Sequence, residues 1–125
     1  MAILWLIVKL FGLVWIDHLR RGNARLATML QDDDVCCHQF VAGEMACGNL
    51  KNRDELLGLL DALPQAPVAE HIEVLELVAK RKLAGRGLAW IDLHLLASAL
   101  IGRRQIWTMD KALNQTADEL EIASQ

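Results

Sequence analysis

Residues 87–101 read GLAWIDLHLLASALI, and the rest of the chain is organised around this segment. From Leu93 onward it is apolar on almost every face of a helix, with His94 and Ser98 as the exceptions. A helix that is apolar all round is a buried helix. Asp92 stands where this helix should begin, and its carboxylate suits the free N–H groups and the positive dipole end of a first turn. We therefore predict a central buried helix with Asp92 at its N-terminus, where capping is the simplest role for the carboxylate.

Short apolar segments alternate with helical patterns along the whole sequence. We expect strands within residues 3–15, at 35–38 and at 105–108, with a short final strand at 121–123 as one option for the C-terminal end. We expect helices after Asn23, over 40–49, from Asn52 to Leu63, over 70–83, and from Lys111 to about Leu120. The alternation predicts an α/β fold with a mostly parallel sheet. A length of 125 residues with 54% apolar residues predicts one domain with a real core.

The helix expected over residues 70–83 has the clearest amphipathic pattern in the chain. Glu76 and Lys80 form an i,i+4 pair on its polar side. Its predicted buried side carries Ile72, Leu75, Val78, Ala79 and Leu83.

Composition and charge restrict the classes of protein that the chain can be. The net charge of −3 is unlike that of a protein that coats the nucleic-acid backbone. Three cysteines, two of them adjacent, make a poor disulfide framework and indicate free thiols in a reducing compartment. They also lack the spacing of a zinc site. The apolar residues 1–16 are short for a membrane span, so a buried strand is preferred over the alternative of a membrane-surface anchor.

Three carboxylates stand at or near predicted strand-to-helix junctions. Asp92 begins the buried helix, Asp110 follows the strand at 105–108, and Glu44 lies soon after the strand at 35–38. In a parallel α/β sheet such junctions meet at the carboxyl edge, where ligands bind. Glu44 has only small or apolar neighbours and no opposite charge within one turn, so we expect it to need a partner or a cation. The run at residues 32–34 is interpreted instead as a solvated loop, because adjacent carboxylates do not converge on one ion.

Three sequence runs together resemble the PIN-domain family, in particular the VapC-type toxins of type II toxin–antitoxin pairs. The runs are FVAGEMACG at residues 40–48, GLAWIDLHLLASA at 87–99 and WTMDK at 107–111. Their order and spacing agree with the family from about Val14 to the C-terminus. The resemblance implies a three-layer α/β/α sandwich and a cytoplasmic ribonuclease that depends on Mg²⁺ or Mn²⁺. It also implies a homodimer that is blocked by a small VapB-like antitoxin.

The resemblance assigns roles to individual residues. It implies that Glu44, Asp92 and Asp110 are catalytic and hold the metal, with Thr108 behind them as a supporting hydroxyl. Hard divalent ions prefer such oxygen ligands, and they orient water and neutralise charge on a phosphodiester. Lys111 and Arg86 are candidates to contact RNA phosphate.

Residues 1–13 depart from the family pattern. Aligning the chain on residues 14–22 puts Phe11 where the family has its first catalytic aspartate, and a phenyl ring cannot bind a cation. Two hypotheses from different classes follow. The first is an active ribonuclease that uses the three remaining carboxylates. The second is a catalytically impaired PIN-fold binding module that pairs with an antitoxin. A membrane-associated protein is a third hypothesis and rests only on residues 1–16.

Overall fold

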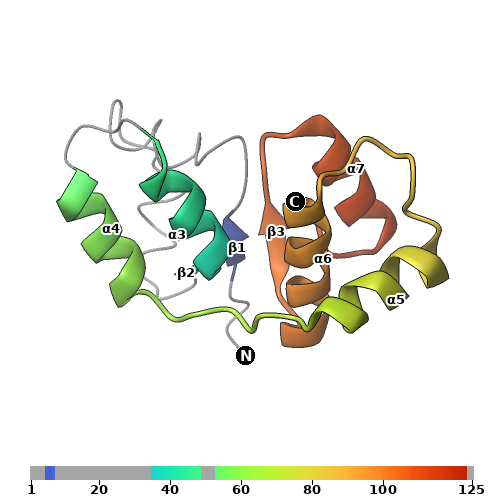
Figure 1. Ribbon diagram of the computed structural model, residues 1–125, viewed down its shortest axis with the longest axis horizontal. Helices are drawn as coiled ribbons and strands as arrows, with labels where there is room; N and C mark the ends of the chain where they lie inside the picture. Colours follow the sequence, from blue (N-terminus) through green and yellow to red (C-terminus); the bar gives the residue numbers. More distant parts are fainter. Residues whose placement is uncertain (1–4, 8–34, 49–52, 124–125) are drawn as a thin grey trace.

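A three-stranded parallel sheet lies at the centre of the computed structural model, which describes residues 5–7, 35–48 and 53–123 (Figure 1). Strand β1 (Trp5–Ile7) pairs on one side with β2 (Val35–Cys36) and on the other with β3 (Gln105–Trp107). The order β2-β1-β3 places the first strand in the middle of the sheet. The chain adds β2 on one side of β1 and later adds β3 on the other side. Such a switch in direction opens a crevice at the carboxyl ends of the strands, which is where α/β proteins bind ligands.

The predicted strands are confirmed wherever the structure describes them. The region predicted within residues 3–15 contributes β1, and Ile106 forms a parallel bridge to Ala123 near the predicted final strand. The N–H of Ile106 donates to the carbonyl of Ile122 at 2.7 Å. The α/β class is therefore confirmed for the described part of the chain.

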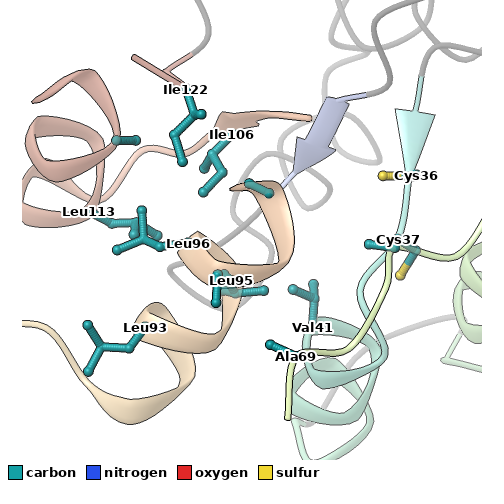
Figure 2. Close-up of a cluster of buried hydrophobic side chains, with 14 of the residues drawn as sticks. Cys36, Cys37, Val41, Ala69, Leu93, Leu95, Leu96, Ile106, Leu113 and Ile122 are labelled. Atoms are coloured by element: carbon teal, nitrogen blue, oxygen red, sulfur yellow. The ribbon is translucent and has the colours of Figure 1, made fainter. Parts of the chain in front are cut away.

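Helix α6 (Trp90–Gly102) is the buried helix that its composition predicts. Its residues 92–99 are all buried. Figure 2 shows Leu95 on the side of Val41 and Ala69, and Leu96 on the side of Leu113. The buried Ser98 hydroxyl donates to the carbonyl of Pro67, which satisfies the one hydroxyl in this helix. The core is thus arranged around α6, with α7 and β3 on one flank and α3 on the other.

Four more helices surround the sheet and α6. They are α3 (Gln39–Ala46), α4 (Arg53–Ala62), α5 (His71–Arg81) and α7 (Lys111–Glu119). In Figure 1, α3 and α4 lie on the side of β2, whereas α5, α6 and α7 lie on the side of β3. All four helices fall within two or three residues of the predicted boundaries.

The predicted buried side of α5 is confirmed at Leu83, just after the helix, and in part at Val78, but it is wrong at Ile72, Leu75 and Ala79. Val74 is the buried residue of this helix, whereas Ile72 is 56% exposed and Leu75 is 44% exposed. Leu77 and Val78 are partly buried against the core beside Val74. The helix therefore turns a face centred on Val74 inward, rather than the one that carries Ile72, Leu75 and Ala79.

Several other predictions can be placed against the described residues. Cys36 and Cys37 are buried free thiols and Cys47 is an exposed one, as expected. The helix after Asn23, the loop at 32–34, the helix start at Asn52 and Phe11 lie outside the described residues. Within the described ranges, no helix combines the length and the apolar character needed to cross a bilayer.

Candidate active site at the carboxyl edge of the sheet

Asp92 is a buried carboxylate in the first turn of α6. Its side chain has 0% exposure, and its Oδ2 atom accepts a hydrogen bond of 2.7 Å from the N–H of Ala89. Ala89, in extended backbone conformation, is the residue that precedes the helix, and Asp92 occupies the third helical position. The prediction that Asp92 itself caps the helix is therefore corrected: it binds back to the capping residue from one turn inside. This is the acidic half of a capping box.

Burying the ionised carboxylate of Asp92 costs free energy unless other groups stabilise its charge. An ionised carboxylate without hydrogen bonds is expensive to bury. The N–H of Ala89 and the positive end of the α6 dipole both stabilise negative charge at this position. Gly87, whose φ of +77° suits glycine, turns the chain immediately before this helix start. The local sequence thus fixes a carboxylate at a defined position in the interior.

Asp110 begins α7 and is half-buried. It follows β3 by three residues and has the extended conformation of a helix-capping residue. Its N–H donates to the Oγ1 atom of the buried Thr108 at 3.1 Å. Thr108 therefore holds the backbone of Asp110, which is consistent with a supporting role for its hydroxyl. Lys111 is exposed in the first turn of the same helix.

Asp92 and Asp110 lie at the same edge of the sheet. A short turn at Arg103 and Arg104 joins α6 to β3, so the helix and the strand run in opposite directions (Figure 1). The start of α6 is therefore beside the end of β3, where Asp110 begins α7. This is the carboxyl edge of the sheet, as the sequence predicts for both residues.

Glu44 has a different environment from the one predicted. It is exposed on α3, so burial does not by itself require a partner, and cation binding by Glu44 stays a prediction. The contact between α3 and α6 is made one turn earlier, where the rings of Phe40 and His94 are 4.8 Å apart. Glu44 lies four residues after Phe40 and so shares its face of the helix. Within the described ranges, no three acidic, histidine or cysteine side chains gather closely enough to enclose a metal ion.

A row of rings crosses this edge and was not predicted. It consists of His38, Phe40, His94, Trp90 and His71, with neighbouring centroids 4.8–5.0 Å apart. His38 caps α3, because its Nδ1 atom accepts the N–H of Phe40 at 3.0 Å. The imidazole of His38 therefore serves as the cap of this helix. The spacing of four between Trp90 and His94 was a signal for one of these contacts, but the others join separate elements.

Two of these histidines have a lowered pKa, which favours the neutral imidazole. Burial lowers the pKa of His38 to about 4, and the nearby His94 acts in the same direction. Burial also lowers the pKa of His94, with a smaller effect from His71. A neutral imidazole can accept the N–H of Phe40 at Nδ1, whereas a protonated one cannot.

Of the two cations proposed to contact RNA, Arg86 is already paired. Its guanidinium lies 2.6 Å from a carboxylate oxygen of Glu119 on α7. An RNA phosphate would have to compete with that carboxylate for Arg86. Lys111 is the more accessible of the two.

The carboxylates at this edge fit a magnesium ion. Mg²⁺ is commonly held by one or two protein carboxylates together with water and substrate phosphate, and it does not need a cage of protein ligands. Asp92 and Asp110 supply hard oxygen atoms of that kind, each fixed at the start of a helix. Glu44, the third ligand that the resemblance implies, lies on the neighbouring helix α3.

Comparison with known proteins gives a close relative. The chain is 49% identical over 111 residues to Ribonuclease VapC32 of Mycobacterium tuberculosis, in both strain CDC 1551 / Oshkosh and strain ATCC 25618 / H37Rv. The match covers 88% of this chain and 90% of the relative. No protein-family profile matches the chain. Identity at this level over nearly the whole of both chains, together with the carboxylates at the sheet edge, shows that the chain belongs to the VapC family of PIN-domain toxin ribonucleases.

Proposed function

We propose that the protein is a metal-dependent endoribonuclease and the toxin of a toxin–antitoxin pair. The observation that carries the proposal is the buried Asp92 at the start of α6, on the same sheet edge as Asp110. A fully buried carboxylate with a fixed orientation is costly, and such groups concentrate at functional sites. The relative at 49% identity is itself named a ribonuclease, which supports the same activity here.

Each residue of the site has a separate role in the proposed reaction. Asp92 and Asp110 hold Mg²⁺ or Mn²⁺, and Glu44 completes the ligand set from α3. Bound there, the ion activates water and neutralises charge on the phosphodiester. Thr108 keeps the backbone of Asp110 in place through the 3.1 Å hydrogen bond from its N–H. Lys111, exposed beside Asp110, contacts the phosphate of the RNA.

The remaining architecture and the partners form part of the same proposal. The parallel order β2-β1-β3, with helices on both sides, supports a three-layer α/β/α sandwich formed by one domain. The family membership supports a homodimer and inhibition by a VapB-like antitoxin. Exposed apolar side chains such as Leu59 on α4 are available for such contacts.

A second function follows from Phe11. If the missing first aspartate abolishes cleavage, the protein keeps the fold as a binding module for its antitoxin. Phe11 lies outside the described residues, so its sequence position alone supports this alternative.

The test is cleavage of a panel of structured RNAs by the purified protein, with Mg²⁺ and with EDTA. We expect cleavage with Mg²⁺ only, and loss of cleavage in Asp92→Asn and Glu44→Gln. Glu55→Gln, at another exposed glutamate one helix away, is the matched control for Glu44 and should leave activity unchanged. Equal activity in EDTA, or full activity of Asp92→Asn, would contradict the proposal. An inactive wild type whose Phe11→Asp variant cleaves RNA would establish the binding module instead.

A further inference from the structure

We propose that Trp90 stacks against an unpaired base of the RNA substrate, next to the phosphate bound at Asp92. Trp90 is the first residue of α6 and stands two residues before the buried Asp92. Its large apolar side chain is 41% exposed, although residues 92–99 of the same helix are all buried. The inference rests on the proposed ribonuclease function, and it adds a means of recognising the substrate.

The Trp90 ring is held in place from two sides. The ring of His94 meets it at 5.0 Å in an edge-to-face arrangement with an angle of 83°. The ring of His71, at the start of α5, lies at 5.0 Å with a tilt of 48°. His94 is itself buried and rests against Phe40 of α3. A side chain ordered before binding loses little conformational entropy when a ligand arrives, so it binds more tightly.

The chemistry of this surface favours a nucleobase. An exposed indole offers a flat π surface, and single-stranded RNA is bound by stacking its unpaired bases on such rings. His71, also exposed, adds a second ring to this aromatic surface. A phosphate held through a metal ion at Asp92 would bring its nucleoside to the start of α6, where Trp90 is the first residue. Stacking tolerates any base, so Trp90 would favour unpaired over paired RNA rather than one sequence.

The experiment measures binding with cleavage silenced. In the Asp92→Asn background, a short fluorescent single-stranded RNA and an abasic strand of the same length are titrated with Trp90→Ala and Trp90→Phe. Loss of one stacked base weakens binding about 5- to 100-fold, so we expect a rise of this size in the Kd of Trp90→Ala for RNA. Trp90→Phe should stay within about 3-fold of the parent, because a phenyl ring still stacks. The Kd for the abasic strand should be the same in both variants as in the Asp92→Asn parent.

The control variant is Ile101→Ala. Ile101 is an exposed apolar residue, 49% exposed, at the other end of the same helix. It should leave the Kd unchanged. Thermal unfolding of each variant, followed by circular dichroism, checks that α6 is intact, and Trp90→Leu, which stays apolar but lacks a ring, replaces Trp90→Ala if that variant does not fold.

The outcomes separate the two proposals. An unchanged Kd for Trp90→Ala, or an equal loss of binding to RNA and to the abasic strand, overturns base stacking. Unchanged RNA binding with loss of antitoxin binding also overturns it and assigns Trp90 to a protein interface. A wild type that fails to cleave RNA in Mg²⁺, while Trp90→Ala still weakens RNA binding selectively, refutes the ribonuclease proposal and supports the stacking.

Discussion

Helices α5 and α6 begin in the same way but lie in opposite environments. In α5 the N–H of Glu70 donates to the side chain of Glu73 at 2.9 Å, at the protein surface. In α6 the N–H of Ala89 donates to the side chain of Asp92 at 2.7 Å, in the interior. The two carboxylates occupy the same third helical position. A surface carboxylate in this position stays hydrated, whereas a buried one carries a desolvation cost, so the interior position of Asp92 distinguishes it from Glu73.

The two helices also differ in how well their burial can be predicted. Every face of α6 is apolar, so no choice of face is needed and the buried helix is predicted correctly. Helix α5 has two overlapping apolar stripes, one through Ile72 and Leu75 and one through Val74, Leu77 and Val78. The structure buries the second stripe because that face meets α6 and the core. A strong amphipathic pattern therefore predicts a helix reliably and its buried face less reliably.

The largest effect that distinguishes the two helices should come from truncating their leucines. Leu96 of α6 is fully buried next to Leu113 (Figure 2), and Leu96→Ala should lower the free energy of unfolding by about 2–5 kcal/mol. Leu75→Ala on α5 is the matched substitution at an exposed leucine and should cost less than about 0.5 kcal/mol. Urea unfolding measures both. Similar losses from the two variants would mean that α5 also buries its Leu75 face.

The second comparison uses the two matched carboxylates. Asp92→Asn keeps an oxygen that can accept the N–H of Ala89 but removes the charge, and it should reduce RNA cleavage more than about 100-fold. Replacing groups that only support a metal ligand costs 10- to 100-fold, and a direct ligand should cost more. Glu73→Gln makes the same change at the start of α5 and should leave cleavage unchanged. Equal activities of the two variants would reduce Asp92 to a capping residue.

Much of the fold follows from the sequence because its signals are local. The strand at residues 105–107 and the start of α7 after Asp110 occur where predicted, and the turn between α5 and α6 lies at two glycines with positive φ, Gly85 and Gly87. Each depends on neighbouring residues only: an apolar run, a capping residue, or a backbone conformation that suits glycine.

The site is less predictable because it depends on contacts between distant segments. The pattern placed Asp92 and Asp110 at one sheet edge, but it did not show that Asp92 binds back to Ala89 or that Glu44 is exposed. The row of rings joins residues 38–40, 71 and 90–94 across three helices. Apart from the spacing of four between Trp90 and His94, no local pattern in the sequence indicates which of these rings meet.

A third helix start, at α3, provides a cap that depends on pH. The pKa of His38 falls from 6.5 to about 4 on folding, so the unfolded chain takes up a proton first as the pH decreases. The contribution of His38 to stability is complete above about pH 6.5 and is lost as the pH falls toward 4. From pH 7 to pH 5 this amounts to about 2 kcal/mol.

The measurement is the difference in pH dependence between the wild type and His38→Asn. Asparagine can cap the helix but does not titrate, so the variant should lose less stability between pH 7 and pH 5. Urea unfolding at several pH values gives both curves, and other titrating groups cancel in the comparison. Parallel curves would show that His38 is not the group responsible.

A smaller effect should decide which face of α5 is buried. Val74 is fully buried, and Val74→Ala should cost about 1–2 kcal/mol because two methyl groups leave the core. Ile72→Ala removes more atoms from the same helix but from an exposed position, and should change stability by less than about 0.5 kcal/mol. If Ile72→Ala proves the more destabilising of the two in urea unfolding, the face predicted from the amphipathic pattern is the buried one after all.

The smallest expected effect lies in the turn that joins the two helices. Arg86, between Gly85 and Gly87, is paired with Glu119 of α7 at 2.6 Å, on a partly exposed surface where such pairs contribute about 0.2–1 kcal/mol. Glu119→Gln should therefore lower stability by less than about 1 kcal/mol, and less still in high salt because exposed charges are screened.

The same variant releases the guanidinium of Arg86, four residues before the start of α6, the helix that carries Asp92. If Arg86 binds RNA phosphate, Glu119→Gln should lower the KM for RNA without changing kcat, and Arg86→Ala should raise the KM. An unchanged KM in both variants would leave Lys111 as the phosphate contact and restrict Arg86 to joining the turn to α7.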